Sequence, residues 1–302
     1  MHQEYDISII TINYNGLKDT CELIDTLPLG NDKLEVIVVD NASLQDEASI
    51  IEQRYPRVTV VRSSKNLGFA GGNNLGIQAS HGRYLFFINN DTIIETKNEE
   101  QRNNFLQPLI ERLESSDKIG MVCPKIRFSW GNHLIQYAGY TPLSSITMRN
   151  HSIGFGEEDH GQYDTPHQTP YAHGAAMLVK REVINRVGMM PECFFLYYEE
   201  LDWSMMIRRA GYEIWFDPSF TVYHKESQST GQDSPLRTYY LTRNRLLFVR
   251  RNIHQPERLL SYIYLIGVVA VKDCLKSLFR RRLDLVKAIM CGIIHFNKKI
   301  AI

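Results

Sequence analysis

The run Val36-Ile37-Val38-Val39-Asp40 is a nearly continuous β-branched stretch that ends on an acid, and it sets the pattern for the first 126 residues. Strands that are apolar on both faces are typical of a parallel sheet covered by helices on both sides. Runs of this kind predict strands at residues 7–12, 34–39, 59–61, 84–88 and 119–126. Helix-like segments separate them at residues 17–27, 46–55, 71–80 and 99–115. The alternation predicts an α/β fold with a mainly parallel central sheet.

The second part of the chain is less regular. Residues 128–169 are rich in Gly, His and Ser without periodicity, so we expect loops and short antiparallel strands there. Regular signals return as a strand at 175–179, a helix from Arg181, a helix at 199–209 closed by Gly211, and a last pair of helices at 235–251 and 256–281. We therefore expect a domain of residues 1–234, with halves 1–126 and 127–234, and a basic helical extension of residues 235–302.

The composition is that of a folded globular protein, with 302 residues, 43% of them hydrophobic, and 34 basic and 34 acidic side chains. These figures exclude a disordered, collagen-like or coiled-coil chain. A neutral total also argues against a dedicated nucleic-acid binder, which would carry a strongly basic domain. The zero is nevertheless a cancellation, because residues 235–302 carry 14 basic and 3 acidic side chains, a net of +11, which leaves −11 for residues 1–234.

The five cysteines are scattered without a CxxC pair, which fits a reducing cytosol and gives neither a disulfide framework nor a zinc site. Glu4 and Asp6 precede the first apolar run, so we expect no secretion signal and a cytoplasmic location. The longest apolar run, residues 259–271, would rise about 20 Å as a helix, short of the roughly 30 Å core of a bilayer. Five basic residues follow between Lys272 and Arg282. The run predicts either peripheral contact with an anionic membrane or a helix packed on this domain or on a second subunit.

Polar residues gather where the predicted strands end. They lie at residues 13–16 (NYNG), 40–43 (DNAS), 66–74 (NLGFAGGNN) and 89–91 (NND). The carboxyl ends of parallel strands meet at one edge of the sheet, where ligands bind. The first turn holds a single glycine instead of G-x-G-x-x-G, which disfavours a dinucleotide cofactor, and the absence of G-x-x-x-x-G-K-[ST] removes a P-loop.

An aromatic ring, two carboxylates and a glycine-rich loop suit a nucleoside diphosphate. Tyr14 can stack on a base, Asp40 can accept from a base N–H or a ribose hydroxyl, and Asp91 can hold a divalent cation between diphosphate oxygens. Taken singly each signal is weak, because an Asp at a strand end is more often a turn former or helix cap. Four such features at four strand ends favour a ligand site.

A second cluster of acids follows an aromatic run at residues 194–198. Glu199, Glu200 and Asp202 lie in a first helical turn, where acids complement the helix macrodipole, and that effect explains one or two of them. A helix N-terminus reached through apolar residues lines a pocket, so we predict that one of the three is a general base. His224 ends a strand-like segment and becomes a metal ligand only if the fold brings it to Asp91.

Eight motifs in this order resemble the family 2 inverting glycosyltransferases, in particular their rhamnosyltransferase-like branch. The motifs are residues 11–15 (TINYN), 38–43 (VVDNAS), 66–73 (NLGFAGGN), 89–92 (NNDT), 173–177 (HGAAM), 198–202 (YEELD), 208–212 (RRAGY) and 223–225 (YHK). The resemblance covers residues 7–251. It implies a GT-A fold and transfer of a sugar from a nucleoside diphosphate donor with inversion at the anomeric carbon.

The resemblance also implies roles for single residues. It assigns nucleotide-sugar contacts to Asn13, Tyr14, Asn15, Asp40, Asn66, Gly71 and Asn90. It implies a divalent cation, Mg²⁺ or Mn²⁺, at Asp91 and His224. The catalytic base matches Glu200, ahead of Glu199 and Asp202. The acceptor site matches His173, Gly174 and Trp203.

The resemblance further implies a dTDP-rhamnose or UDP-hexose donor and a glycan or lipid-linked acceptor in cell-surface polysaccharide synthesis. The chain departs from the family pattern twice, with a single acid in the metal turn and with Glu200 where Asp is commoner. Two other function classes stay open. A nucleotide-sugar-binding protein without turnover is compatible with the single-acid turn, whereas a sugar nucleotidyltransferase needs a basic, Gly-rich triphosphate loop that residues 13–18 do not supply.

Overall fold

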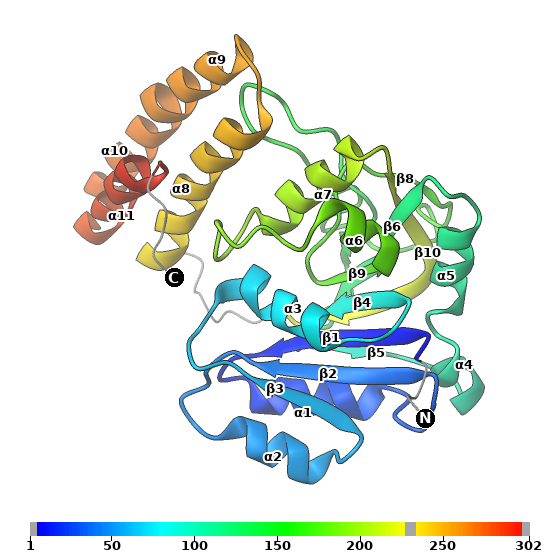
Figure 1. Ribbon diagram of the computed structural model, residues 1–302. Coiled ribbons are helices and arrows are strands. Elements are labelled where there is room, and N and C mark those ends of the chain that lie inside the picture. Colours follow the sequence, from blue (N-terminus) through cyan, green and yellow to red (C-terminus); the bar gives the residue numbers. More distant parts are fainter. Residues whose placement is uncertain (1–4, 227–233, 298–302) are drawn as a thin grey trace.

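The computed structural model describes residues 5–226 and 234–297 and is built around one mixed sheet (Figure 1). Its strands are β1 (Ile7–Asn13), β2 (Leu34–Asp40), β3 (Val58–Arg62), β4 (Tyr84–Ile88), β5 (Thr92–Ile94), β6 (Ile119–Phe128), β7 (Ile135–Tyr137), β8 (His167–Gln168), β9 (Ala176–Lys180) and β10 (Glu213–His224). The strand order is β3-β2-β1-β4-β9-β6-β10-β5, with β7 beside β6 and β8 beside β10.

Strands β3, β2, β1 and β4 run parallel, as does the pair β6 and β10. Strand β9 is antiparallel to both β4 and β6, and β5 is antiparallel to β10. The predicted α/β class with a mainly parallel sheet is therefore confirmed. All seven residues of β2 are buried, which is the burial expected of its continuous apolar run.

Helices cover both faces of this sheet. They are α1 (Leu17–Thr26), α2 (Glu47–Arg54), α3 (Gly68–Ala79), α4 (Glu99–Asn103), α5 (Gln107–Glu114), α6 (Arg181–Val187), α7 (Glu199–Arg209), α8 (Pro235–Asn252), α9 (Glu257–Tyr264), the π-helical segment η1 (Leu265–Ala270), α10 (Val271–Phe279) and α11 (Leu283–His295). Successive side chains of a strand point to opposite faces. In β1, Ile10 and Ile12 lie against the glycines of α3, whereas Asn13 bonds Thr20 of α1, so these two helices lie on opposite faces.

Two helix predictions need correction. The single helix expected over residues 99–115 is two helices, because Pro108 fits only the first turn of a helix and so starts α5 afresh. The last pair of helices is also incomplete as predicted. The expected second member corresponds to the continuous run α9, η1 and α10, and a further helix, α11, follows a turn in which Arg281 has a φ of 55°.

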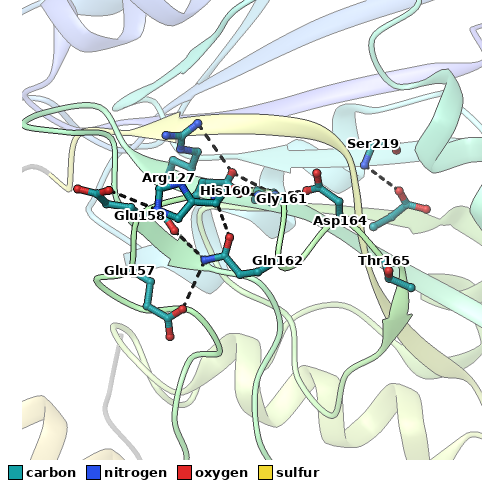
Figure 2. Close-up of polar contacts among 12 residues, drawn as sticks. Arg127, Glu157, Glu158, His160, Gly161, Gln162, Asp164, Thr165 and Ser219 are labelled. Carbon is teal, nitrogen blue, oxygen red and sulfur yellow. Dashed lines mark hydrogen bonds and ion pairs between the residues drawn. The ribbon is translucent and has the colours of Figure 1, made fainter.

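The irregular segment of residues 128–169 contains only the short strands β7 and β8, as expected. Its acidic loop, residues 157–165, lies against β6, and Figure 2 shows Arg127 of that strand reaching toward it. The buried ammonium group of Lys125 lies 3.1 Å from both carboxylate oxygens of Asp159, and Arg127 lies 3.8 Å from the same carboxylate. Cations on β6 thus fix the acidic loop to the sheet.

The C-terminal helices pack beside α7 at one end of the molecule (Figure 1). A second hydrophobic cluster joins the two parts, with Phe194 and Tyr198 from the segment before α7 and Leu246 and Phe248 from α8. Through the described ranges, no helix has the length and hydropathy needed to cross a bilayer.

Candidate active site

The ends of β1 and β2 form a polar hub around Asn13, whose side chain is fully buried. Its Nδ2 donates to Asp40 Oδ1 at 2.9 Å, and its Oδ1 accepts from the Thr20 hydroxyl at 2.7 Å. Asp40 also accepts from the Ser43 hydroxyl at 2.6 Å. The structure therefore places Asn13 as a residue that orients Asp40, without exposed surface of its own.

Tyr14 and Asn15 lie next to this hub in the turn after β1. The Tyr14 side chain is 47% exposed, so its ring can receive a ligand. Asn15 adopts a φ of 52°, and its Oδ1 accepts from the backbone N–H of Leu44 at 2.8 Å. That bond fixes the turn after β1 to the turn after β2, which keeps the Tyr14 ring and Asp40 in adjacent turns.

The glycine-rich loop expected at residues 66–74 is helical from Gly68 onward, where α3 begins, and its start is held by close packing. The Oδ1 atom of Asn66 accepts from the N–H of Gly68 at 2.8 Å and from Nδ2 of Asn41 at 3.1 Å. Gly68 has a φ of 72°, and a Cβ there would lie 2.0 Å from the carbonyl oxygen of Phe195, so only glycine fits. Gly71 is buried in the first turn of α3. The segment before α7 therefore lies directly on this loop.

Asp91 and His224 come together at the ends of β4 and β10, which is the approach that a shared metal site would require. Nε2 of His224 lies 3.1 Å from Oδ1 of Asp91, and both side chains are buried. The other ring nitrogen, Nδ1, lies 2.8 Å from Oε1 of Gln136, and this contact orients the ring with Nε2 toward Asp91. Asn90 donates to the Thr20 hydroxyl at 2.9 Å and thereby joins this turn to the hub.

The pair suits a divalent ion shared with a substrate. Within residues 5–226 and 234–297, no three His, Cys, Asp or Glu side chains gather, so Asp91 and His224 offer two protein ligands. Mg²⁺ is usually held by one or two carboxylates plus substrate phosphates, and imidazole is a ligand for several transition metals. The hydrogen bond between Nδ1 and Gln136 is the kind of outer contact that orients a ligating histidine. The donor set therefore fits such an ion.

The three acids of α7 have different surroundings. Asp202 is 1% exposed and accepts a bidentate bond from Arg251 of α8, with contacts between 2.9 and 3.1 Å. Its charge is thus paired inside the protein. Glu199 is also buried, and its Oε2 has no hydrogen-bond partner. Glu200 is partly buried.

Burial shifts the protonation of both glutamates. It raises the pKa of Glu200 from 4.5 to about 7. Burial also raises the pKa of Glu199 well above its ordinary value, with a further contribution from the neighbouring charge of Glu200. Both glutamates are thus shifted toward the protonated form, and Glu200 can take up and release a proton near pH 7. Glu200 has the properties of a general base that works near pH 7.

Residues 173 and 174 bridge the Asp91–His224 pair and Glu200. The ring of His173 lies 6.3 Å, between centroids, from the ring of His224. A Cβ on Gly174 would lie 3.8 Å from Cγ of Glu200 and 3.7 Å from Cζ of Phe69, so Gly174 faces the base and the glycine-rich loop together. Burial, and then the charge of His224, lowers the pKa of His173 to about 3, so its ring is neutral.

Trp203, the third residue assigned to the acceptor, lies in the core. Its side chain has no exposed surface, its indole N–H donates to the carbonyl of Gly188 at 3.0 Å, and its ring packs edge-on against Phe87 at 5.6 Å. It fixes α7 on the sheet and offers no surface to an acceptor.

Sequence reasoning missed several residues of this site. Gln136 is an isolated amide between Ile135 and Tyr137, and a polar residue inside an apolar strand is a signal that could have found it. Asn244 and Arg251 of α8 lie in a sequence rich in arginine that resembles a solvated helix face. No local signal marks Asn244 as buried or Arg251 as the partner of Asp202 in α7.

A mixed sheet with this strand-end site is the architecture of the GT-A glycosyltransferases. The chain belongs to glycosyl transferase family 2, whose family model matches residues 8–188. It is similar to the low-salt glycan biosynthesis hexosyltransferase Agl10 of Haloferax volcanii, with 24% identity over 96% of this chain and 90% of that protein. It is also similar to the dTDP-rhamnosyl transferase RfbF of Shigella flexneri, with 27% identity over 83% of this chain and 82% of that protein.

Solved structures of glycosyltransferases share the fold. A crystal structure of S. aureus TarS, residues 1–349, has a TM-score of 0.57 and 16% identity, over 94% of this chain and 81% of that one. The mannosyltransferase PcManGT of Pyrobaculum calidifontis, in complex with GDP-Man and Mn²⁺, has a TM-score of 0.57 and 15% identity, over 97% of this chain and 76% of that one.

Proposed function

We propose that this protein is an inverting glycosyltransferase that uses a nucleoside diphosphate sugar. The observation that carries the proposal is that residues 173 and 174 connect the two parts of the site, because His173 lies beside His224 of the Asp91–His224 pair and Gly174 faces Glu200. A displacement at an anomeric carbon needs a stabilised leaving group on one side and a base on the other. We infer that residues 1–234 supply this catalytic unit and that residues 235–302 are its helical extension.

In the proposed reaction, the Glu200 carboxylate takes the proton from an acceptor hydroxyl. The acceptor oxygen forms a bond to the anomeric carbon from the face opposite the nucleotide, and the electron pair of the breaking C–O bond leaves with the diphosphate. This single displacement inverts the anomeric configuration. Tyr14 stacks on the base of the donor, and Asp40, fixed by Asn13, accepts from the base or ribose.

Asp91 and His224 would hold a divalent ion, Mg²⁺ or Mn²⁺. When bound, such an ion neutralises the negative charge that develops on the leaving diphosphate. PcManGT, which shares the fold, was solved in complex with GDP-Man and Mn²⁺, and this supports the proposal of a divalent cation.

The donor and acceptor are proposed from the relatives. RfbF is a dTDP-rhamnosyl transferase, and an N-acetylglucosaminyl-diphospho-decaprenol L-rhamnosyltransferase of Mycobacterium tuberculosis is 22% identical over 75% of this chain and 78% of that protein. We propose a dTDP-rhamnose or UDP-hexose donor and a glycan or lipid-linked acceptor in polysaccharide synthesis.

The test is a panel of dTDP-, UDP- and GDP-sugars, each with and without Mg²⁺ or Mn²⁺. We expect one donor to raise the melting temperature in a metal-dependent manner and to be slowly hydrolysed. An Asp91→Asn variant should lose the metal dependence. A thermal shift without hydrolysis or transfer would favour a sugar-nucleotide-binding protein, and no shift with any donor would contradict the proposal. NMR of the product then gives the anomeric configuration, and retention would exclude the inverting reaction.

We further propose that the outer face of α9, η1 and α10 lies on an anionic membrane from the cytoplasmic side. Of the 19 large hydrophobic side chains exposed in the described chain, eight lie in α9, η1 and α10, between Leu259 and Phe279, and Phe279 is 90% exposed. A cluster of exposed hydrophobic side chains of this kind marks an interaction surface. The excess of basic over acidic residues in the same segment favours anionic lipid as the partner, since each Lys or Arg near such a surface contributes about 1 kcal/mol.

Sedimentation with vesicles tests this surface. We expect binding to phosphatidylglycerol vesicles and none to phosphatidylcholine vesicles, with binding lost in a Leu275→Ser/Phe279→Ser variant. Phe155→Ser is the matched control, because Phe155 is 62% exposed in the other part of the chain. Failure of the wild-type protein to bind anionic vesicles, together with a dimer in light scattering that the double variant abolishes, would assign the face to a second copy instead.

A further inference from the structure

The segment that leads into α7 has an unusual backbone. We call residues 194–198 the strap. Phe195, Tyr197 and Tyr198 have φ values of 70°, 68° and 79°. Residues other than glycine rarely adopt this left-handed conformation, because their Cβ atom crowds the backbone. Three aromatic residues in four positions therefore need contacts elsewhere that hold the strap in place.

One buried side chain of α8 supplies those contacts. Nδ2 of Asn244 lies 2.9 Å from the carbonyl oxygen of Phe194, 2.7 Å from that of Leu196 and 2.9 Å from that of Tyr197. Asn244 has no exposed surface. Its own Oδ1 accepts from Nη1 of Arg243 at 2.6 Å, so the carboxamide is fixed in orientation. The NH₂ group of one side-chain amide thus contacts three carbonyl groups of the strap, at a buried position where water does not compete for them.

The strap touches both sides of the reaction centre. Its Phe195 carbonyl accepts from the N–H of Phe69 at 2.9 Å, in the first turn of α3, which is the part of the glycine-rich donor loop that the strap contacts. At its other end, the Tyr198 carbonyl accepts from the N–H of Asp202 at 2.9 Å and so begins the first turn of α7, which carries Glu200. A displacement of the strap would move the donor loop and Glu200 relative to one another.

We propose that Asn244 is a positioning residue for the transfer reaction, which acts by holding the strap so that Glu200 stays aligned with the donor loop. This inference rests on the proposed role of Glu200 as the base. It assigns to the C-terminal helices a part in catalysis that is distinct from any membrane contact, since Asn244 faces inward and the apolar residues of α9 and α10 face outward.

The test compares Asn244→Leu with the wild-type protein and with Leu109→Ala. Leu109 is fully buried in α5, and its truncation lowers stability without touching the strap. In Asn244→Leu we expect kcat to fall about 100-fold, since a misplacement of about 1 Å costs that much, while the dissociation constant for the nucleoside diphosphate changes by less than about threefold. Hydrogen exchange of the peptide that spans residues 193–200 should accelerate in Asn244→Leu and not in Leu109→Ala.

Asn244→Asp is the second variant in case the leucine protein does not fold. An ionised Asp has nearly the same volume and can pair with Arg243, but it cannot donate to the strap carbonyls. A kcat within about threefold of wild type in either variant, or a parallel loss of kcat and nucleotide affinity as in a merely unstable protein, would overturn the proposal. If Glu200→Gln keeps transfer, the proposed base is wrong; if Glu200→Gln is inactive and the Asn244 variants are active, only the positioning role fails.

Discussion

Replacement of Glu200 with Gln is predicted to stop transfer and, at the same time, to stabilise the fold above pH 7. The carboxyl group of Glu200 is partly buried, and burial raises its pKa from 4.5 to about 7. Its neighbours Glu199 and Tyr140 are also acids whose pKa values burial raises, so neither supplies a compensating positive charge. Glutamine has nearly the same shape and stays neutral at every pH, and the substitution therefore removes only the cost of the charge.

The size of the effect follows from the pKa difference. Each pKa unit corresponds to about 1.36 kcal/mol, so the interval from 4.5 to about 7 gives an upper value of about 3 kcal/mol. The folded protein binds this proton more tightly than the unfolded chain, so the contribution of the group to stability is complete below pH 4.5 and is lost as the pH rises through about 7. The free energy of unfolding of Glu200→Gln should equal that of wild type near pH 4.5 and exceed it by up to about 3 kcal/mol at pH 8.

The rate of sugar transfer should depend on the same ionisation of Glu200, but it should rise with pH where the stability falls. A base must be ionised to take a proton, and with a pKa of about 7 about a tenth of the molecules are ionised at pH 6 and about nine tenths at pH 8. Transfer at limiting acceptor should therefore rise about tenfold between these pH values. A carboxylate at its ordinary pKa would give a flat profile over the same range.

The assay is urea unfolding of both proteins at pH 5 and pH 8, together with the release of nucleoside diphosphate from pH 5.5 to 8.5. Glu182→Gln serves as the control, since Glu182 is a 68% exposed glutamate on α6 whose replacement should change stability by less than about 0.5 kcal/mol. A wild-type protein that is as stable as Glu200→Gln at pH 8, or a rate that does not change between pH 6 and pH 8, would refute the reasoning.

Three further substitutions test other parts of the site. Gln136→Leu removes the hydrogen-bond partner of Nδ1 of His224, and calorimetry should show affinity for Mn²⁺ about 10- to 100-fold lower. Arg251→Leu leaves the buried Asp202 without its cation and should cost about 2 kcal/mol in urea unfolding, less than for a fully buried pair because the Arg251 side chain is 37% exposed. Tyr14→Ala removes the proposed stacking ring and should weaken nucleotide binding about three- to tenfold in a titration, whereas unchanged binding would show that the base lies elsewhere.

The sheet and the strand-end residues could be predicted because they depend on local sequence. A strand buried on both faces requires a continuous apolar run, and parallel strands bring their carboxyl ends to one edge. Asn13 and Asn90 follow two such strands, and the Thr20 hydroxyl bonds both side chains. The sequence did not reveal that Asn13 is fully buried and bonded to Asp40, because burial at a strand end depends on which helix covers it.

Contacts between distant segments could not be predicted in the same way. His224 is a candidate metal ligand only because it lies 3.1 Å from Asp91, and this approach depends on β10 pairing with β5 at the far edge of the sheet. The contacts that α8 makes with α7 and the strap could not be predicted from the sequence for a different reason. Arginines in a helix usually indicate a solvated face, and Arg243 is nevertheless 1% exposed because it serves Asn244 and the strap.

Residues 1–234 and 235–302 carry opposite net charges, but they share a buried hydrophobic cluster and are not independent units. Phe194 and Tyr198 from the strap and Leu246 and Phe248 from α8 form one buried cluster. Arg251 of the same helix pairs with Asp202, and its Asn244 contacts the strap carbonyls, so the inner face of α8 packs against the segment that carries the proposed base. The remaining helices carry most of the exposed apolar side chains and much of the basic excess on the outside. A structure arranged in this way holds the proposed base, Glu200, at a fixed position relative to the proposed membrane surface.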